Sequence, residues 1–426
     1  MGPSKCAHEL HRHERSERVR ELMSFYKTAS TQQLRLLLTL GADPTPLYND
    51  CTGEKILEKR KSDGSICESC YSRFKDFLDN AKDIHNEVMQ MPRNKRSANG
   101  MIALTLDGGG IRGLVSVVIL LFASRRLFGN ERLPNVFDWL IGTSTGSMLA
   151  LTLAKGSSLT DAFFLYWEMK DQIFLKSSTT AKRLFGATVD RQTKNVDKVL
   201  EKCFPDHFTF ASCSKRLTVP TLDVSKRPAR LHVFRNYRVH SESYDVNKDD
   251  VRFRDAARAS SAAPTYFHPL IYKDKVLVDG SFVANCPLNI LFKEFDQCNI
   301  VEPEVSLAAV ISIGTGEPSE TARKLQNGTS IPSKWKYFRY VVKLLLEQVV
   351  GHEKFDLESA RYRCLNEHIP FLRISPDGIR MRIDQINDDK LTEMIWTTLK
   401  YMKDNVKQVD FLGDILFKVL NSNGVS

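Results

Sequence analysis

The 426-residue sequence has no apolar run of the roughly 20 residues that a membrane-spanning helix needs. The best candidate, Leu114 to Ala123, is about half that length and ends shortly before Arg125-Arg126. The first residues are polar and charged, which does not match a secretory signal peptide. We therefore expect a cytoplasmic protein and disfavour a membrane-spanning or secreted one.

Cysteine is sparse and odd in number, with nine residues spread over the chain. This favours free thiols in a reducing compartment over a disulfide framework. Cys67-x-x-Cys70 with Cys51 and His85 is an alternative zinc site, but the spacings are loose and no second C-x-x-C motif exists. There is also no EF-hand loop and no His-x-x-x-His pair on a helix. We predict no metal and no cofactor.

Positive charge is concentrated in one part of the chain. The net charge is +10, and residues 172–240 hold 14 Lys or Arg against 5 Asp or Glu. A local basic face suggests an anionic partner, which leaves a phospholipid surface, nucleic acid or an acidic ligand, while a solvated surface is the alternative. Nucleic acid is disfavoured because no recognised nucleic-acid module accompanies the charge and aromatic residues are not regularly interleaved with it.

The N-terminal region, residues 1–95, is charged and weakly patterned. Gln33 to Leu40 predicts a short helix that ends at Gly41, and the sequence around it resembles the tail of an ankyrin repeat. One or two degenerate repeats cannot bury their own faces. This segment therefore leans on the main domain or is the stub of a longer array.

From Met101 onward, short apolar strands alternate with helical patterns, which predicts a mainly parallel α/β sheet with helices on both faces. We divide this part into a catalytic domain at 101–320 and a C-terminal helical extension at 321–426. Strands are expected at 102–106, 136–141, 276–278, 306–313 and 371–374. Helices are expected at 113–128, 145–154, 159–174, 287–297, 333–350, 387–404 and 408–420.

A glycine turn, Asp107 to Gly113, directly follows the first strand. Its Gly108-x-Gly110-x-x-Gly113 spacing matches a dinucleotide-binding fingerprint, but the second strand runs into Gly142 instead of ending at the acidic residue that binds the ribose. Consecutive glycines before a helix also expose backbone N–H groups that bind developing negative charge. The turn therefore favours an anion hole over a nucleotide site.

A second turn, Gly142-Thr143-Ser144-Thr145-Gly146, lies between an apolar strand and a helix. A G-x-S-x-G sequence in that context is typical of a nucleophile elbow, which lifts the serine hydroxyl clear of the backbone. The flanking Gly142 and Gly146 let strand and helix pass closely, and the helix dipole favours an oxyanion nearby. This pattern indicates a nucleophilic Ser144, with an ordinary loop as the alternative.

The base that would activate the serine is less clear from the residues alone. The downstream histidines at 207, 232, 240, 268, 352 and 368 do not close an apolar strand in a glycine-flanked turn, so a surface or capping role is favoured. Asp279-Gly280 does follow an apolar strand, and burial would raise the pKa of that carboxyl enough to improve it as a base. A plain turn at Asp279-Gly280 is the alternative.

Taken together, these motifs resemble the signature of patatin-like phospholipases. The resemblance covers about residues 101–320 in order and rests on the segments 107–113, 142–146, 258–267, 279–280 and 312–316. With the upstream ankyrin-like segment, the chain looks most similar to the animal calcium-independent (group VI) phospholipases A. The long ankyrin arrays typical of those proteins are missing from this sequence.

The resemblance implies a Ser–Asp dyad without a catalytic histidine. Ser144 would be the nucleophile and Asp279 the base, and the glycines at 108, 109 and 110 would line the oxyanion hole. Arg112 would lie at that turn, either in support or as a structural ion-pair partner. The implied reaction is calcium-independent hydrolysis of a glycerophospholipid acyl ester through an acyl-enzyme. The alternatives are a triacylglycerol lipase, a lysophospholipase or acyltransferase on the same dyad, and a non-catalytic membrane-binding module.

An enzyme of this kind without a membrane span has to reach lipid from the interface, so we expect a peripheral protein with the phospholipid surface as its partner. Two segments suit that role: the aromatic cluster Phe163-Phe164-x-Tyr166-Trp167, and 334–350, which mixes Lys, Arg, Trp and aliphatic residues as interfacial helices and calmodulin targets do. Helices packed on the sheet are the alternative for both. Calmodulin binding and homo-oligomer formation stay open.

Overall fold

The computed structural model describes residues 30–42, 76–77, 80–81, 84, 100–173, 187–240, 251–264, 266–316, 353–379 and 381–421. Its centre is an eight-stranded sheet in the order β5-β6-β3-β2-β1-β7-β8, with β4 paired to β3. The strands are β1 (Met101–Leu106), β2 (Trp139–Gly142), β3 (Arg216–Asp223), β4 (Arg230–Arg235), β5 (Leu270–Tyr272), β6 (Lys275–Val278), β7 (Leu307–Ile313) and β8 (Phe371–Ile374). Strands β3, β2, β1, β7 and β8 are parallel, and β4, β5 and β6 join by antiparallel pairs. The predicted mainly parallel α/β fold is confirmed.

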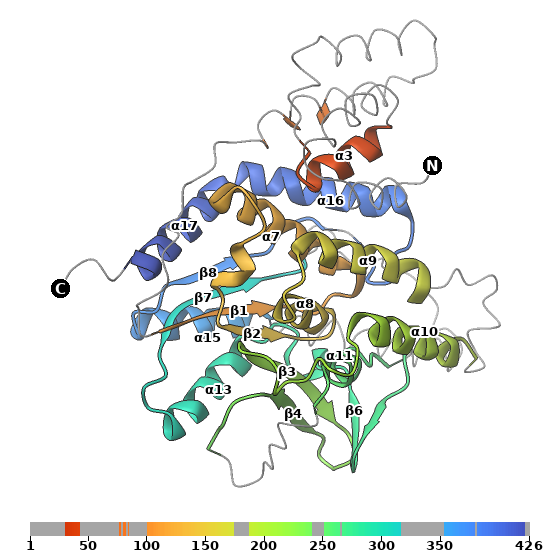
Figure 1. The fold of residues 1–426 in the computed structure, drawn as a ribbon, viewed down its shortest axis with the longest axis vertical. Helices are drawn as coiled ribbons and strands as arrows, with labels where there is room; N and C mark the ends of the chain where they lie inside the picture. The colour runs from red at the N-terminus through yellow and green to blue at the C-terminus, as the bar shows by residue number, and fades with distance from the viewer. Residues whose placement is uncertain are drawn as a thin grey trace, which may run out of the picture.

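Helices cover both faces of the sheet (Figure 1). They are α3 (Thr31–Thr39), α7 (Gly113–Phe128), α8 (Thr145–Ala154), α9 (Leu159–Ile173), α10 (Ala187–Cys203), α11 (Phe253–Ser260), α12 (Ser281–Ala284), α13 (Leu288–Val301), α15 (Glu353–Asn366), α16 (Asp388–Asp404) and α17 (Val406–Asn421). Successive β1 residues contribute to different cores, because strand side chains alternate between faces. Ile102 and Leu104 pack with α7, α8 and α16, while Ala103 packs with α13 and α15.

Several predicted elements agree with the structure to within a few residues, including β1, α7, α8, β7, β8 and α16. The second strand is shorter than predicted, because Leu133–Val136 forms a 3-10 helix and β2 begins at Trp139. Strand β3 was not predicted: it carries Pro220, a residue that argues against a strand within a sheet. The pattern at 333–350 lies outside the described residues.

The short N-terminal helix α3 packs against the main domain. Ser30 caps it, with reciprocal hydrogen bonds to Gln33 that satisfy otherwise unpaired N–H groups. Arg35 forms an ion pair with Glu393 of α16 at 2.7 Å, and its guanidinium lies 5.2 Å from the centre of the Trp396 ring. The helix therefore buries its apolar face against α16 and α7. Its resemblance to an ankyrin repeat stays a prediction.

Residues beyond 320 take part in the central sheet. Strand β8 pairs in parallel with β7, and α16 packs along α7. Figure 1 shows α16 running between α3 and α7, with α17 at the left of the view. The proposed boundaries at 95, 101 and 320 remain predictions, but the described part of the C-terminal segment completes one edge of this sheet.

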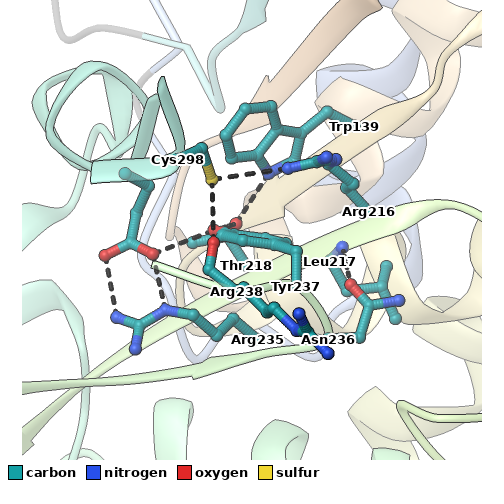
Figure 2. A network of polar contacts seen from close by, with 10 residues as sticks. Trp139, Arg216, Leu217, Thr218, Arg235, Asn236, Tyr237, Arg238 and Cys298 are labelled. Carbon is teal, nitrogen blue, oxygen red and sulfur yellow. Dashed lines mark hydrogen bonds and ion pairs between the residues drawn. The ribbon is translucent and has the colours of Figure 1, made fainter. Parts of the chain in front are cut away.

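A buried polar network ties β2, β3, β4 and α13 together (Figure 2). The Glu294 carboxylate accepts two hydrogen bonds from Arg235, at 2.6 and 2.8 Å, and one from the Tyr237 hydroxyl at 3.0 Å. Thr218 joins the Tyr237 hydroxyl at 2.6 Å and accepts the Trp139 indole N–H at 2.7 Å. Because buried polar groups are costly unless paired, this network holds β3 in one position against β2.

Candidate active site

Two strand ends meet along one edge of β3. Strand β2 runs parallel to β3 and pairs with its first half, while β6 runs antiparallel and pairs with Leu222 and Asp223 on the same edge. The carboxyl ends of β2 and β6 therefore converge from opposite directions near Pro220. Ser144 follows the end of β2 and Asp279 follows the end of β6, and the Ser144 Oγ donates to Asp279 Oδ2 at 2.9 Å.

The Ser144 turn has the geometry of a nucleophile elbow. Ser144 has φ 53° and ψ −124°, a conformation that costs a non-glycine residue about 1 to 3 kcal/mol. A Cβ at Gly142 would lie 2.2 Å from the Gly146 carbonyl oxygen, and one at Gly146 would lie 2.3 Å from that of Leu106. Both predicted glycines are therefore sterically required, and the serine side chain stands at the start of α8 with its residue 7% exposed.

Asp279 is a buried carboxyl with a shifted proton affinity. Only 3% of the residue is exposed, and this burial raises the pKa of Asp279 to about 6. Hydrogen bonds from Ser281 and Ser144 act in the opposite direction, and the Ser281 N–H donates to Oδ1 at 2.7 Å. Gly280 is required here, because a Cβ would lie 2.2 Å from the Pro220 carbonyl oxygen. The carboxyl is thus suited to exchange a proton near neutral pH.

The glycine turn lies directly against the serine. A Cβ at Gly108 would lie 3.2 Å from the Ser144 Cβ. The Gly108 N–H donates to a backbone carbonyl at 3.1 Å, and the Gly109 N–H donates to the Thr145 hydroxyl at 3.2 Å. Within the described part of the chain, the N–H groups of Gly110 and Thr145 have no acceptor. Backbone N–H groups with a long hydrogen bond or none therefore lie beside the Ser144 hydroxyl.

Two arginines hold the glycine turn in place. Arg373 of β8 forms a buried, two-pronged ion pair with Asp107, the first residue of the turn. Arg112, at the far end of the turn, donates from Nη1 to the Gly316 carbonyl oxygen at 3.3 Å. Arg112 thus contacts backbone of the segment after β7, and its predicted role in supporting the turn or as an ion-pair partner stays a prediction.

The sequence analysis missed Ser260, as it missed Arg373. Ser260, at the end of α11, accepts the Ser144 backbone N–H at 2.9 Å and donates to the Pro220 carbonyl oxygen at 2.7 Å. Its hydroxyl therefore connects the strained elbow to β3 at the point where the two strand ends meet. The only signal in the sequence was its place in the segment 258–267, which had been used for family resemblance alone.

Ser260→Ala is expected to slow the reaction of Ser144 with a fluorophosphonate by roughly tenfold, because the buried Ser144 N–H loses its acceptor. The matched control is Ser261→Ala, whose buried hydroxyl donates only to Ala257 of its own helix. Labelling rates are to be measured beside thermal unfolding of each variant. Equal labelling rates in Ser260→Ala and the wild type would contradict the positioning role.

The predicted aromatic cluster on α9 is part of the core. Phe163, Phe164, Tyr166 and Trp167 are each at most 7% exposed, and α9 packs against α7 and α10. The alternative of a packed helix therefore holds for 163–167, and this cluster does not face a membrane. No helix among the described residues is long and apolar enough to span one. The calmodulin segment 334–350 and the zinc candidates Cys51, Cys67, Cys70 and His85 lie outside the described residues.

The histidines of the described ranges lie away from the dyad. His268 is exposed and joins Asp190 at 2.6 Å, and His232 is buried on β4 beside Phe234. In the part of the chain that the structure describes, no histidine hydrogen-bonds to Ser144 or Asp279. The arrangement offers one hydroxyl, one proton-accepting carboxylate and backbone donors for an anion.

Residues 104–292 match the family model described as patatin-like phospholipase. They form a patatin-like phospholipase domain. The matched range contains the glycine turn, the Ser144 elbow, Ser260 and Asp279, while β7, β8 and α16 follow it. The patatin-like domain thus carries the dyad, and Arg373, which orients its glycine turn, comes from outside the matched range.

The chain is similar to several phospholipases along most of its own length. It is 28% identical over 357 residues to the 85/88 kDa calcium-independent phospholipase A2 of Mus musculus, covering 77% of this chain and 42% of that protein. It is 25% identical over 359 residues to the intracellular phospholipase A2 of Caenorhabditis elegans, covering 82% and 32%. The cGAMP-activated phospholipase of Vibrio cholerae serotype O1 is 29% identical over 245 residues, covering 53% and 66%. The chain spans less than half the length of the first two relatives.

Proposed function

We propose that this chain is a calcium-independent lipid acyl hydrolase that cleaves fatty acyl esters of glycerophospholipids. The observation that carries the proposal is the 2.9 Å hydrogen bond from the Ser144 hydroxyl to the buried Asp279, within a patatin-like domain. Its relatives bear the names of calcium-independent phospholipases A2, which supports phospholipid as the substrate class. The protein would work at the cytoplasmic surface of a membrane.

In the proposed reaction, Ser144 attacks the acyl carbonyl carbon while its proton passes to Asp279. The carbonyl oxygen becomes an oxyanion, which the N–H groups of the glycine turn at 108, 109 and 110 would stabilise. Since the Gly108 N–H already donates to a backbone carbonyl, the Gly109, Gly110 and Thr145 donors are favoured for this role. Collapse of the intermediate breaks the ester C–O bond, and Asp279 returns the proton to the departing lysophospholipid oxygen.

The second half of the reaction repeats these steps with water. Asp279, again ionised, accepts a proton from a water molecule that attacks the acyl-enzyme carbonyl. The bond between the acyl carbon and Ser144 Oγ then breaks, the proton returns to the serine, and the fatty acid leaves. A lysophospholipid or acyl acceptor in place of water would give an acyltransferase on the same dyad, and triacylglycerol in place of phospholipid would give a lipase.

The proposal is tested by fatty acid release from phosphatidylcholine vesicles in excess EGTA, beside emulsified triacylglycerol and lysophospholipid. We expect release from phospholipid that is unchanged when calcium replaces EGTA. A clear preference for triacylglycerol or lysophospholipid would assign the dyad to that substrate instead. Absence of release from all three lipids, with Ser144 still reacting with a fluorophosphonate, would overturn the proposed lipid substrate class.

A further inference from the structure

Two β-hairpins project beyond the dyad at the carboxyl edge of the sheet. One joins β3 to β4 through residues 224–229, and the other joins β5 to β6 through Lys273 and Asp274. They lie side by side because β6 pairs with β3, and the Val224 N–H donates to the Val276 carbonyl oxygen at 2.9 Å. Figure 1 shows them at the bottom of the view, opposite α16 and α17.

Aliphatic side chains line one face of this double hairpin. Ile271 pairs directly with Val276, and the register of β3 with β6 places Val224 opposite Val276 on the other side. Residues directly opposite one another in a sheet lie on the same face. Ile271 is 69% exposed and Val224 is 39% exposed. The result is an apolar ridge across three neighbouring strands, open to solvent at its outer end.

Basic residues surround the ridge. Residues 224–230 are all exposed, and the basic side chains of the two hairpins are Lys226, Arg227, Arg230, Lys273 and Lys275. The acidic residues of the same hairpins are Asp223, which is buried and bonded to Ser225, and Asp274. Lys273 also takes φ 54°, at a turn position where Gly, Asn or Asp is preferred. A lysine therefore occupies the tip of this hairpin although its positive φ is unfavourable for a side chain of that size.

We propose that this double hairpin, defined by residues 223–230 and 270–276, docks the protein on a bilayer containing anionic phospholipid. Exposed aliphatic residues rimmed by Lys and Arg are the combination that binds a membrane interface, through apolar insertion and attraction to anionic head groups. The net positive charge of the hairpins complements such a surface, and the β3–β4 hairpin lies within the basic region 172–240. The purpose of this docking rests on the proposed function, because it assumes a phospholipid substrate in the membrane. Vesicle binding itself can be measured whether or not the protein hydrolyses lipid.

The position of the hairpins relative to the dyad gives the docking a direction. Asp279 follows β6 directly and lies five residues from Asp274 at the tip, which is roughly 17 Å along an extended strand. The elbow and the glycine turn follow β2 and β1, which run parallel to β3 toward the same edge. A bilayer held at the hairpin tips would therefore face the edge of the sheet that carries Ser144.

The test measures co-sedimentation of the full chain with phosphatidylcholine vesicles, with and without phosphatidylserine. Lys226→Glu/Lys273→Glu changes one exposed lysine on each hairpin, and Lys407→Glu/Lys418→Glu is the matched control on α17. We expect the hairpin variant to bind the anionic vesicles roughly 10- to 100-fold more weakly, with the control unchanged. Equal binding by the two variants, or no vesicle binding by the wild type, would overturn the proposal.

The apolar ridge is tested separately. Ile271→Asn is expected to weaken binding to both kinds of vesicle by roughly tenfold. The matched control is Ile300→Asn on α13, where the isoleucine is 55% exposed. Ile271→Asn that binds as tightly as Ile300→Asn would show that the ridge does not enter the bilayer.

Hydrolysis separates failure of docking from failure of the proposed function. Each variant is assayed on vesicles and on a soluble short-chain ester, which needs no membrane contact. We expect the hairpin variants to lose vesicle hydrolysis and keep hydrolysis of the soluble ester. If the hairpin variants hydrolyse vesicles at the wild-type rate, docking is overturned and the proposed function stands. If the hairpin variants lose vesicle binding but the wild type hydrolyses neither substrate, docking is supported and the proposed function is overturned.

Discussion

Ser144→Ala is expected to lower fatty acid release by at least about 10⁴-fold, because no covalent acyl-enzyme can form without the hydroxyl. The residual rate would come from substrate binding and the backbone donors alone. Release is to be measured on phospholipid vesicles with wild type and variant purified in parallel. Fluorophosphonate labelling should disappear with the hydroxyl. Equal release from both proteins would mean that another residue is the nucleophile.

Ser144→Gly is the matched control for the backbone of the elbow. Both variants lack the hydroxyl, but glycine adopts φ 53° without the strain that alanine retains. The glycine variant should therefore be more stable than the alanine variant by about 1 to 2 kcal/mol, while both are inactive. Thermal unfolding of the two proteins measures this difference. Active Ser144→Gly would refute the assignment of the nucleophile.

Asp279→Asn is expected to lower kcat/KM by about 10²- to 10⁴-fold, because an amide cannot accept the Ser144 proton. In the wild type, burial raises the pKa of Asp279 to about 6, and the proton acceptor has to be ionised. The kcat/KM of the wild type should therefore fall tenfold per pH unit below about pH 6 and level off above it. A soluble short-chain ester is the substrate for this profile. A flat profile from pH 4.5 to 8 would contradict Asp279 as the base.

The same carboxyl should make the folded protein less stable as pH rises. Because the pKa of Asp279 is raised in the folded state from 3.8 to about 6, the folded protein binds this proton more tightly than the unfolded chain does. This contribution is fully present below pH 3.8 and is lost as pH rises through about 6. At pH 8 the ionised group then costs up to about 3 kcal/mol. Asp279→Asn should recover part of that cost at pH 8 and little at pH 4, as measured by denaturant unfolding.

The sequence predicted the elements with strong local signals. Residues 113–128 and 145–154 are continuous apolar helices that begin at glycine-rich turns, and the structure confirms their bounds. Strand β3 and helix α10 were missed, because Pro220 interrupts the first and polar residues dominate the second. The position of β3 also depends on tertiary contacts, such as the Glu294 network, that no local pattern reports.

The dyad and its supports differ in how far the sequence reveals them. Ser144 and Asp279 stand in short motifs at strand ends, so the residues could be proposed before their contact was known. Ser260 and Arg373 do not stand in such a strand-end motif, since each acts through hydrogen bonds to residues brought close only by folding. The aromatic cluster on α9 was visible in the sequence but ambiguous, because a buried helix and an interfacial helix share the same aromatic pattern.

Two contacts that hold the glycine turn come from residues that follow the matched range. Arg373 pairs with Asp107, and the Ile383 carbonyl oxygen accepts the Ile111 N–H at 2.9 Å, although both residues follow the matched range by some 80 positions or more. Substitutions around 371–387 could therefore shift the proposed oxyanion donors while every recognised motif stays the same. Two relatives with identical motifs can therefore differ in rate through residues that lie outside the matched range.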